Sequence, residues 1–385
     1  MTAHCKAAVS RLSVRDFRNL QNAELLPGPG VNLFLGDNAQ GKTNLMEAVW
    51  LFTGERSFRG ARDTELVRFG AESFRLELDF TAQGGEHRAS LAYSGAKQAA
   101  LDGVKLSSAA ELAGHFPAVA FSPEDLSLAK GAPQLRRRFL NAAIAQLFPR
   151  YGAELARYSE LLRQRNALLK DIPRHAELLD TLDIWDDRLS ALGGSVAFLR
   201  LRYLRRLVPC AAEVYRGIAA EAEAGAQPGE APEELSIAYE SPYAAFDPER
   251  EPPAAAELTA AMAAELAARR RDDIEAGFTG TGPHRDDLAL SVGGKPARLF
   301  ASQGQQRSAV LALKLAEARV LGESAGVSPV LLLDDVMSEL DRHRQDYLLH
   351  HIGESQVFLT CCDDGLFAGA GPRIFRVRNG ALLPE

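Results

Sequence analysis

The hydrophobic and polar residues of the first 150 positions follow the short period of β-strands. Runs rich in β-branched and aromatic residues occur at 9–14, 31–35, 74–80 and 87–93, with glycine and polar turns between them. Asp102-Gly103 is typical of a tight hairpin. One helix is predicted to begin within 41–52, where Leu45, Val49 and Phe52 share a face. This part of the chain is therefore predicted to be mixed α/β.

From about residue 151 the period changes to that of helices. A helix over 182–207 would be about 39 Å long, and its apolar residues form a coiled-coil seam at steps of three and four. The seam consists of Leu182, Trp185, Leu189, Leu192, Val196, Leu199 and Tyr203. The same spacing from Leu155 to Leu169 predicts a preceding helix, with 171–180 as the turn. An ordinary antiparallel helical lobe is favoured over a projecting rod because the stretch is short.

The α/β pattern returns near the end of the chain. Residues 219–235 are acidic and of low complexity, which predicts a loose connection, and 254–275 returns as a helix after two prolines. Beyond Gly277 come an apolar strand, a Gly293-Gly294 hairpin, a helix over 301–318 and a buried strand at 330–333. We therefore expect one α/β domain made from both chain ends, 1–150 and 276–385, with an inserted helical lobe at 151–275.

Composition narrows the class of protein. The 385 residues are 46% hydrophobic and 25% charged, as in ordinary proteins with sizeable cores. No apolar run approaches the ~20 residues of a membrane span. The four cysteines have no metal spacing and suggest no disulfide framework, so we expect a cytoplasmic protein without a membrane partner. The net charge of −7 argues against a coat of nucleic acid but leaves room for a local basic face.

The stretch GDNAQGKT predicts a nucleotide site because it follows a strand and precedes a helix. Its backbone N–H groups are expected to cradle phosphates, Lys42 to meet the β- and γ-phosphates, and the Thr43 hydroxyl to ligate Mg²⁺. The predicted nucleotide-binding residues here are Gly36, Asp37, Asn38, Ala39, Gln40, Gly41, Lys42 and Thr43.

A second acidic element follows the buried strand at 330–333. Asp334 is predicted to hold Mg²⁺ together with Thr43, and Asp335 to face the attacking water. The alternative for Asp335 is a helix N-cap or a strand-end turn. A carboxylate base shorter than glutamate is expected to hydrolyse ATP slowly.

The stretch ASQGQQR, upstream of this strand by one helix, is the third element. Alone it would be an N-cap serine followed by a helix. In company with the other two motifs it resembles the signature loop of the ATP-binding-cassette superfamily, Leu-Ser-Gly-Gly-Gln. The resemblance implies that Ser302, Gly304 and Gln305 reach the γ-phosphate held by a second subunit, with Ser302 taking part in catalysis.

The separation of the motifs selects among families of that superfamily. Residues 42 and 334 lie 292 positions apart with helices between them, as in the SMC and Rad50 proteins, whose insertions are far longer. The short insertion and six stretches of sequence, two of them the motifs just described, resemble the RecF family of bacterial recombination mediators. These stretches are 17–20, 57–66, 123–141, 281–288, 302–307 and 331–341. Ala129 and Asn141 depart from the family pattern, outside the nucleotide motifs.

The resemblance implies an ATP-dependent homodimer that binds double-stranded, gapped or junction DNA. It also implies ATP and Mg²⁺ as ligands, RecR and RecO as partners, RecA loading downstream, and slow ATP hydrolysis as a switch. Two alternatives remain from the motifs alone, an ATPase subunit of a transporter and a chromosome-organising SMC-like head. The split head argues against the first and the short insertion against the second.

Several residues keep two interpretations. Arg18 and Asn19 either approach the nucleotide or form a structural contact, and the cluster from His284 to Asp287 is either functional or a buried ion-pair group. Glu124 and Gln134 are both candidates for the cassette Q-loop, and Thr360 stands where transporter cassettes have histidine. Candidate DNA-phosphate contacts, each with a solvated surface as its alternative, are Arg136, Arg137, Arg138, Arg200, Arg202, Arg205 and Arg206.

Overall fold

The computed structural model describes residues 5–223, 233–353, 355–361 and 371–383. The chain forms two compact units. The sheet unit contains Met1–Ser127, Gly217–Glu230 and Arg307–Glu385, and the helical unit contains Leu128–Arg216 and Ala231–Gln306. The boundaries of these units differ from those of the predicted segments. Residues 128–150 and 276–306, which were predicted to belong to the α/β domain, lie in the helical unit.

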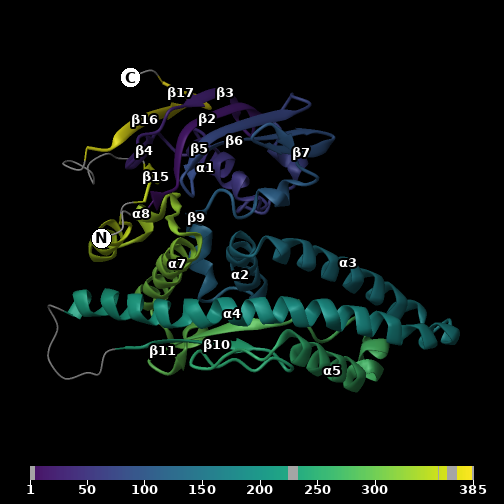
Figure 1. Cartoon of the computed structure of the whole chain (residues 1–385). Helices are drawn as coiled ribbons and strands as arrows, with labels where there is room; N and C mark the ends of the chain where they lie inside the picture. Colours follow the sequence, from purple (N-terminus) through teal and green to yellow (C-terminus); the bar gives the residue numbers. More distant parts are fainter. Residues whose placement is uncertain (1–4, 224–232, 354, 362–370, 384–385) are drawn as a thin grey trace. The chain divides into compact units, whose positions relative to one another are not determined.

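A mostly parallel six-stranded sheet, ordered β17-β16-β4-β15-β14-β9, is assembled from both chain ends (Figure 1). Its strands are β4 (Val31–Leu35), β9 (Ala118–Phe121), β14 (Val330–Leu333), β15 (Val357–Cys361), β16 (Arg373–Arg378) and β17 (Ala381–Leu382). Only the β16–β17 pair is antiparallel. The central strands are buried along their length, as expected for a parallel sheet covered on both faces. The prediction of one α/β domain built from both chain ends is confirmed.

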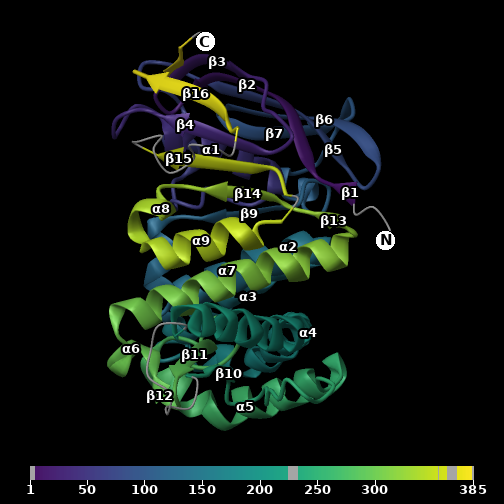
Figure 2. The ribbon, with the colours of Figure 1, turned by 90° about the vertical axis from the view of Figure 1, so that its left-hand side faces the viewer.

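Helices α1 (Lys42–Trp50), α7 (Gln303–Ala325), α8 (Val336–Glu339) and α9 (Arg342–His351) accompany this sheet (Figure 2). A second, antiparallel sheet is ordered β3-β2-β5-β6-β7-β8. It consists of β2 (Ala8–Phe17), β3 (Leu20–Leu25), β5 (Phe74–Ala82), β6 (Gly85–Ser94), β7 (Ala96–Leu101) and β8 (Val104–Lys105), and β1 (Cys5–Lys6) pairs with β13 (Val327–Ser328). Asp102-Gly103 forms the predicted hairpin between β7 and β8.

The helical unit contains α2 (Pro133–Leu147), α3 (Pro149–Asp171), α4 (Leu182–Glu223), α5 (Ala255–Ala276) and the short α6 (Ala297–Phe300). A three-stranded antiparallel sheet, β10 (Leu235–Glu240), β11 (Asp287–Val292) and β12 (Lys295–Pro296), completes it. Polar contacts join Arg165 to Asp186, Glu154 to Ser195 and Tyr151 to Arg200, so α3 and α4 run antiparallel, as predicted. The predicted turn between them contains a 3-10 helix at Ala176–Thr181.

Helix α4 is longer than the predicted 182–207. It continues through Pro209, which has no N–H to donate to the preceding turn and ordinarily interrupts a helix. Beyond the proline, Ala211, Tyr215 and Ile218 are buried at steps of three and four, which keeps the helix amphipathic. The predicted loose connection lies mostly outside the described residues, and 219–223 form the end of α4. In the described parts of the chain, no helix is both long and apolar enough to cross a membrane.

Candidate nucleotide-binding site

Polar residues gather at one edge of the parallel sheet, where four neighbouring strands end. β4 leads into the phosphate loop (residues 36–43), β14 into Asp334, β15 ends with Thr360 and Cys361, and β9 leads into Ser122. The register pairs Leu333 with Leu359 and Leu35 with Cys361, so these strand ends are level. A parallel sheet thus joins motifs almost three hundred residues apart.

The phosphate loop has a backbone that ordinary residues rarely adopt. Gly36 and Gly41 have φ values of 155° and 114°, and Ala39 has φ of 65°. A Cβ atom at Gly36 would lie 2.3 Å from the carbonyl oxygen of Val377, so no larger residue fits without displacement. Lys42 is buried and donates from Nζ to the carbonyl oxygens of Gly36 and Asp37, the latter at 2.9 Å. The ammonium group is therefore held over the loop that precedes α1.

Asp334 contacts the phosphate loop through the side chain of Thr43. The Thr43 hydroxyl donates to its Oδ1 at 2.9 Å, and the Thr360 hydroxyl donates to the same atom at 3.0 Å. Burial raises the pKa of the Asp334 carboxyl, with the charge of Asp335 acting in the same direction. A hydroxyl and a carboxylate in contact are the hard oxygen ligands that Mg²⁺ takes beside nucleotide phosphates, so these residues fit the ion.

Among the described residues, no three His, Cys, Asp or Glu side chains are grouped to hold a metal.

Asp335 is held in a strained conformation at the start of α8. Its φ of 52° lies in the left-handed region, which non-glycine residues adopt mostly at turns and functional sites. Its backbone N–H donates to the Thr360 hydroxyl at 2.7 Å, and Ser338 donates to its carbonyl oxygen at 2.8 Å. Thr360 therefore contacts both aspartates through one oxygen, a role that its position at a strand end did not predict.

Arg18 has the structural role that was one of its two interpretations. It donates from Nε and Nη2 to both carboxylate oxygens of the buried Glu47, each at 2.9 Å. Asn19 instead lies beside the phosphate loop, where its Nδ2 is 3.4 Å from the carbonyl oxygen of Ala39 and its Oδ1 accepts from Asn44 at 2.8 Å.

One cation near this edge was not singled out in the sequence. Arg59 donates to Asn44 at 3.1 Å, and its charge acts to lower the pKa of Asp334. The sequence signal that could have identified Arg59 is its position in the stretch 57–66, which resembles the RecF family.

For the Q-loop, Glu124 is exposed directly after β9 at the same edge of the sheet, whereas Gln134 lies in α2 of the helical unit. The choice between them stays a prediction.

The serine loop (Ser302–Arg307) begins α7 with a reciprocal cap. The Ser302 backbone N–H donates to Gln305 Oε1 at 2.6 Å, and the Gln305 backbone N–H donates to Ser302 Oγ at 3.2 Å. Ser302 and Gln303 are exposed. The capping role is thus present, and the predicted role of Ser302, Gly304 and Gln305 toward a second subunit stays a prediction.

Two of the seven candidate DNA contacts have structural roles instead. Arg200 is 1% exposed and donates to the carbonyl oxygen of Pro283 at 2.6 Å. Arg136 is 6% exposed and forms a two-pronged ion pair with Asp287 at 2.6 and 2.8 Å. Side chains so enclosed have no free face for a phosphate, because a buried guanidinium needs its carboxylate and carbonyl partners.

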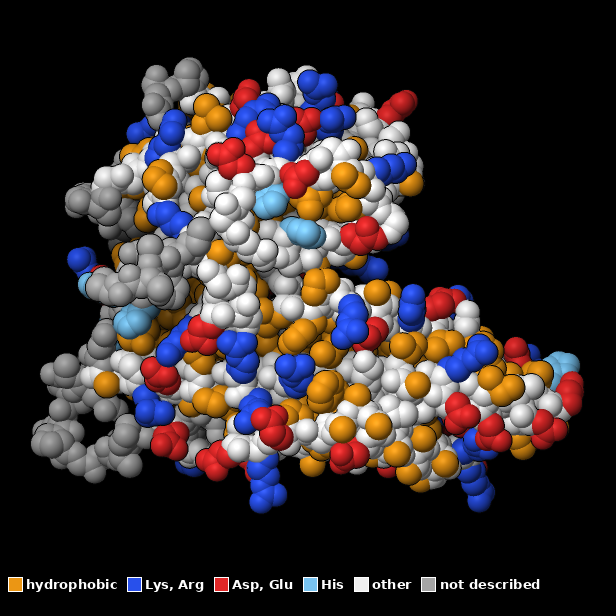
Figure 3. All heavy atoms as spheres, viewed as in Figure 1, with side chains coloured by type: hydrophobic (Ala, Val, Ile, Leu, Met, Phe, Trp, Pro, Cys, Tyr) orange, Lys and Arg blue, Asp and Glu red, His pale blue; other side chains and the backbone are white. Residues whose placement is uncertain are grey.

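The other five arginines differ in exposure. Arg137 is half-buried on the carbonyl oxygen of Asp286, and Arg205 is paired with Glu251. Arg138, Arg202 and Arg206 are exposed, and Arg202 stacks on Phe148 and Phe198. Basic side chains are interspersed with acidic ones over the face of the helical unit drawn in Figure 3. Arg138, Arg202 and Arg206 are the most exposed of the seven candidates, and a DNA contact by any of the five that are not buried stays a prediction.

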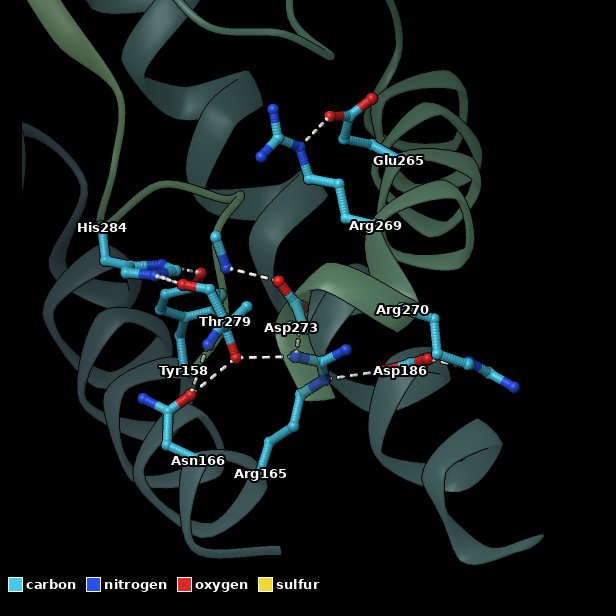
Figure 4. Close-up of polar contacts among 11 residues, drawn as sticks. Tyr158, Arg165, Asn166, Asp186, Glu265, Arg269, Arg270, Asp273, Thr279 and His284 are labelled. Atoms are coloured by element: carbon cyan, nitrogen blue, oxygen red, sulfur yellow. Dashed lines mark hydrogen bonds and ion pairs between the residues drawn. The ribbon is translucent and has the colours of Figure 1, made fainter. Parts of the chain in front are cut away.

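Residues 279–287 form a mostly buried polar segment. Of the two interpretations of the His284–Asp287 cluster, the structure agrees with a buried group of polar contacts. Arg165 donates to Asp186 at 2.7 Å, and to Asp273 and Thr279 at 2.8 Å each (Figure 4). Asp286 accepts from the hydroxyls of Tyr239 at 2.5 Å and Tyr243 at 2.9 Å. Arg285 alone is exposed, over the ring of Phe278.

His284 is a neutral member of this network. Its Nδ1 lies 2.7 Å from the Tyr158 hydroxyl and its Nε2 3.1 Å from the carbonyl oxygen of Thr279 (Figure 4). A carbonyl oxygen only accepts, so Nε2 carries the proton and Nδ1 accepts from the tyrosine. Burial lowers the pKa of His284 to about 4, against an ordinary value of 6.5.

Acid is therefore expected to destabilise the protein through His284. Between pH 6.5 and 4 the unfolded chain binds a proton that the folded chain excludes, so this stability is present above pH 6.5 and is lost as the pH falls. Urea unfolding at pH 7 and pH 5 should show a loss about 1–2 kcal/mol larger in the wild type than in His284→Gln. His175→Gln, at an exposed histidine, is the matched control. Equal losses in His284→Gln and the wild type would contradict the assignment.

Comparisons with known proteins agree on one family. The model of the RecF/RecN/SMC N terminal domain matches residues 8–381. The DNA replication and repair protein RecF of Anaeromyxobacter dehalogenans is 42% identical over 382 residues, covering 97% of this chain and 98% of the relative. RecF of Ruminiclostridium cellulolyticum is 35% identical over 380 residues, with 97% and 98% covered.

Solved structures give the same answer. The structure of the recombination mediator protein RecF-ATP in the RecFOR pathway matches with a TM-score of 0.87 and 34% identity, covering 99% of this chain and 98% of that one. An Smc head domain from Pyrococcus furiosus matches at a TM-score of 0.51 and 15% identity, covering 98% and 95%, which shows a shared fold alone. With the phosphate loop and Asp334 joined at one sheet edge, the chain belongs to the RecF family of SMC-like ATPases.

Proposed function

We propose that this protein is an ATP-dependent recombination mediator that binds DNA in the cytoplasm. The hydrogen bond between Thr43 and Asp334 carries the proposal, since it joins the two predicted Mg²⁺ ligands across the sheet. ATP would lie on residues 36–43, with Lys42 at the β- and γ-phosphates. The similarity to a solved RecF-ATP structure, at 34% identity over nearly the whole chain, supports ATP as the nucleotide.

The proposed active form is a homodimer. The cap of α7 leaves Ser302 exposed, and the same loop supplies Gly304 and Gln305. The N-terminus of a long helix attracts anions because its first N–H groups lack partners within the helix. We propose that this loop closes on the γ-phosphate held by a second copy of the chain, so that ATP joins two subunits in a two-fold dimer.

The proposed target is double-stranded DNA, including gapped DNA, read through its backbone. Exposed arginines on α2 and α4 would contact the DNA phosphates. The sequence does not show the alternation of aromatic and basic residues that is typical of base stacking, so we propose that the protein does not read the bases. The relatives named for the RecFOR pathway support RecR and RecO as partners. Loading of RecA at replication gaps would follow from that pathway, with slow ATP hydrolysis releasing the DNA.

DNA binding by the purified protein tests this function. Affinity for a gapped duplex should rise when ATP and Mg²⁺ are added, and it should fall steeply with salt because arginines displace counterions. Fluorescence anisotropy at several salt concentrations measures both. A DNA affinity that does not change when ATP is added would contradict the ATP-dependent homodimer as the DNA-binding form. A DNA affinity that does not change with salt would contradict phosphate contacts.

The exposed arginines give the sharper form of the same test. Replacing Arg138, Arg202 and Arg206 with alanine should lower the slope of log affinity against log salt by about 2–3, since each phosphate contact contributes about 0.9. Arg163→Ala, at an exposed arginine of α3 paired with Glu160, is the matched control.

A further inference from the structure

The turn between β16 and β17 lies against the phosphate loop, although it comes from the last residues of the chain. The Asn379 backbone N–H donates to Gln40 Oε1 at 2.6 Å, and the Gly380 backbone N–H donates to the Gln40 carbonyl oxygen at 2.9 Å. Both bonds arise in the sheet unit. The C-terminal turn thus binds the side chain and the main chain of one loop residue.

A second turn, between β2 and β3, lies beside the same loop through Asn19. A Cβ atom on Gly41 would come within 2.7 Å of Asn19 Oδ1. The two turns also meet each other, since a Cβ atom on Gly380 would lie 2.1 Å from the Asn19 carbonyl oxygen. The phosphate loop therefore lies beside two turns that meet at Asn19, and neither Gly41 nor Gly380 has space for a methyl group.

The hydrogen bond to the Gln40 carbonyl has a consequence for the next residue. A trans peptide is planar, and its C=O and N–H groups point in opposite directions. Fixing the Gln40 carbonyl toward the C-terminal turn therefore fixes the Gly41 N–H away from it. With φ of 114°, Gly41 has no side chain to restrict this peptide, so the external hydrogen bond does so.

We propose that the Asn379–Gly380 turn positions the phosphate loop for nucleotide, by fixing the peptide that presents the Gly41 N–H to phosphate. This inference rests on the proposed nucleotide site and adds positioning residues that themselves touch no nucleotide. A preorganised donor binds an anion more tightly, because no free energy of binding is then used to order the loop.

A matched pair of glycine variants tests the role of the turn. Asn379-Gly380, with φ of 49° and 74°, has the conformation of Asp102-Gly103, with φ of 50° and 80°. Alanine at either glycine meets the same backbone strain, but at Gly103 nothing lies within 4 Å of the added methyl group. At Gly380 the added methyl group would clash with the Asn19 carbonyl oxygen, so the backbone there must shift, and we expect the shift to disturb the two bonds to Gln40.

The expected result separates the two variants by affinity rather than by stability. Loss of two hydrogen bonds should weaken ATP binding by Gly380→Ala about tenfold, whereas Gly103→Ala should stay within about twofold of the wild type. Calorimetric titration with ATP and Mg²⁺ measures the affinities. The turnover number should change less than the affinity, because Asp334, Asp335 and Thr360 lie on other strands. Equal affinity losses in both variants would overturn the proposal.

Two further variants keep the inference testable if Gly380→Ala fails to fold. Asn379→Gly keeps the N–H and tolerates positive φ, so ATP affinity should not change. Gln40→Ala removes one acceptor and should weaken ATP binding about threefold. An unchanged affinity in Gln40→Ala, or a loss in Asn379→Gly, would overturn the proposal. A wild-type protein that binds no ATP would instead contradict the nucleotide site itself.

Discussion

Lys42→Ala and Ser302→Arg should each abolish ATP-driven dimerisation, and an equimolar mixture of the two should recover part of it. Lys42 supplies the buried cation of the phosphate loop, and Ser302 is the exposed cap of the loop that we place on a partner's nucleotide. In a mixed dimer, one site combines an intact Lys42 from one subunit with an intact Ser302 from the other. Random pairing then restores about one quarter of the sites, because half of the dimers are mixed and each has one intact site of two.

Sedimentation with ATP and Mg²⁺ measures this recovery. Ser159→Arg places the same substitution at another exposed serine of the helical unit and should dimerise as the wild type does. The loss of the Ser302 cap also costs about 1 kcal/mol of helix stability, so the helical content of that variant should be compared with that of the control. If the mixture stays as inactive as either parent, Ser302 does not act across subunits.

Asp335→Asn should slow ATP hydrolysis by about 10²–10⁴-fold while ATP binding and dimerisation persist. In the proposed step, the water oxygen bonds to the γ-phosphorus, the bond to the bridging oxygen of ADP breaks, and Asp335 accepts the proton of the water. Asparagine has the same shape and keeps the backbone N–H that donates to Thr360. It cannot accept that proton, so the variant should accumulate the ATP-bound dimer.

Phosphate release in a single turnover measures the rate, and calorimetry measures the affinity for ATP. Asp346→Asn makes the same charge change at an exposed position of α9 and should hydrolyse ATP at the wild-type rate. Retained hydrolysis in Asp335→Asn would show that another group accepts the proton. A loss of ATP binding would assign Asp335 to binding rather than to the chemical step.

The sequence predicted the parts of the site whose signal is local. The phosphate loop has fixed residues at fixed spacing between a strand and a helix, and Asp334 ends an uninterrupted apolar strand, so both could be predicted without knowledge of the sheet. The structure brings them into contact through Thr43, and their roles toward nucleotide and Mg²⁺ stay predictions. The seam of α4 was found in the same way, although its continuation beyond Pro209 was not, because burial overrode the local effect of proline.

Long-range pairing could not be predicted from the same patterns. Arg136 and Arg200 lie among other arginines and resemble a solvated basic face, yet their partners are 151 and 83 residues away in the chain. Thr360 gave no sign that it would bond to Asp334 and Asp335, because that contact depends on the strand order β4-β15-β14. The C-terminal turn on Gln40 is separated from it by 339 residues. Such contacts follow from topology, which periodicity does not encode.

The sheet order also affects how the protein folds during its synthesis on the ribosome. Among the described strands β4 pairs with β15 and β16, and both of these are synthesised more than three hundred residues later. At ~5–20 residues per second, a ribosome takes about 20 to 70 s between completing β4 and completing β16. During that time the apolar strand β4 and the phosphate loop that follows it have no strand to pair with. A nascent chain of this protein should therefore engage chaperones at its N-terminal third and acquire nucleotide only on release.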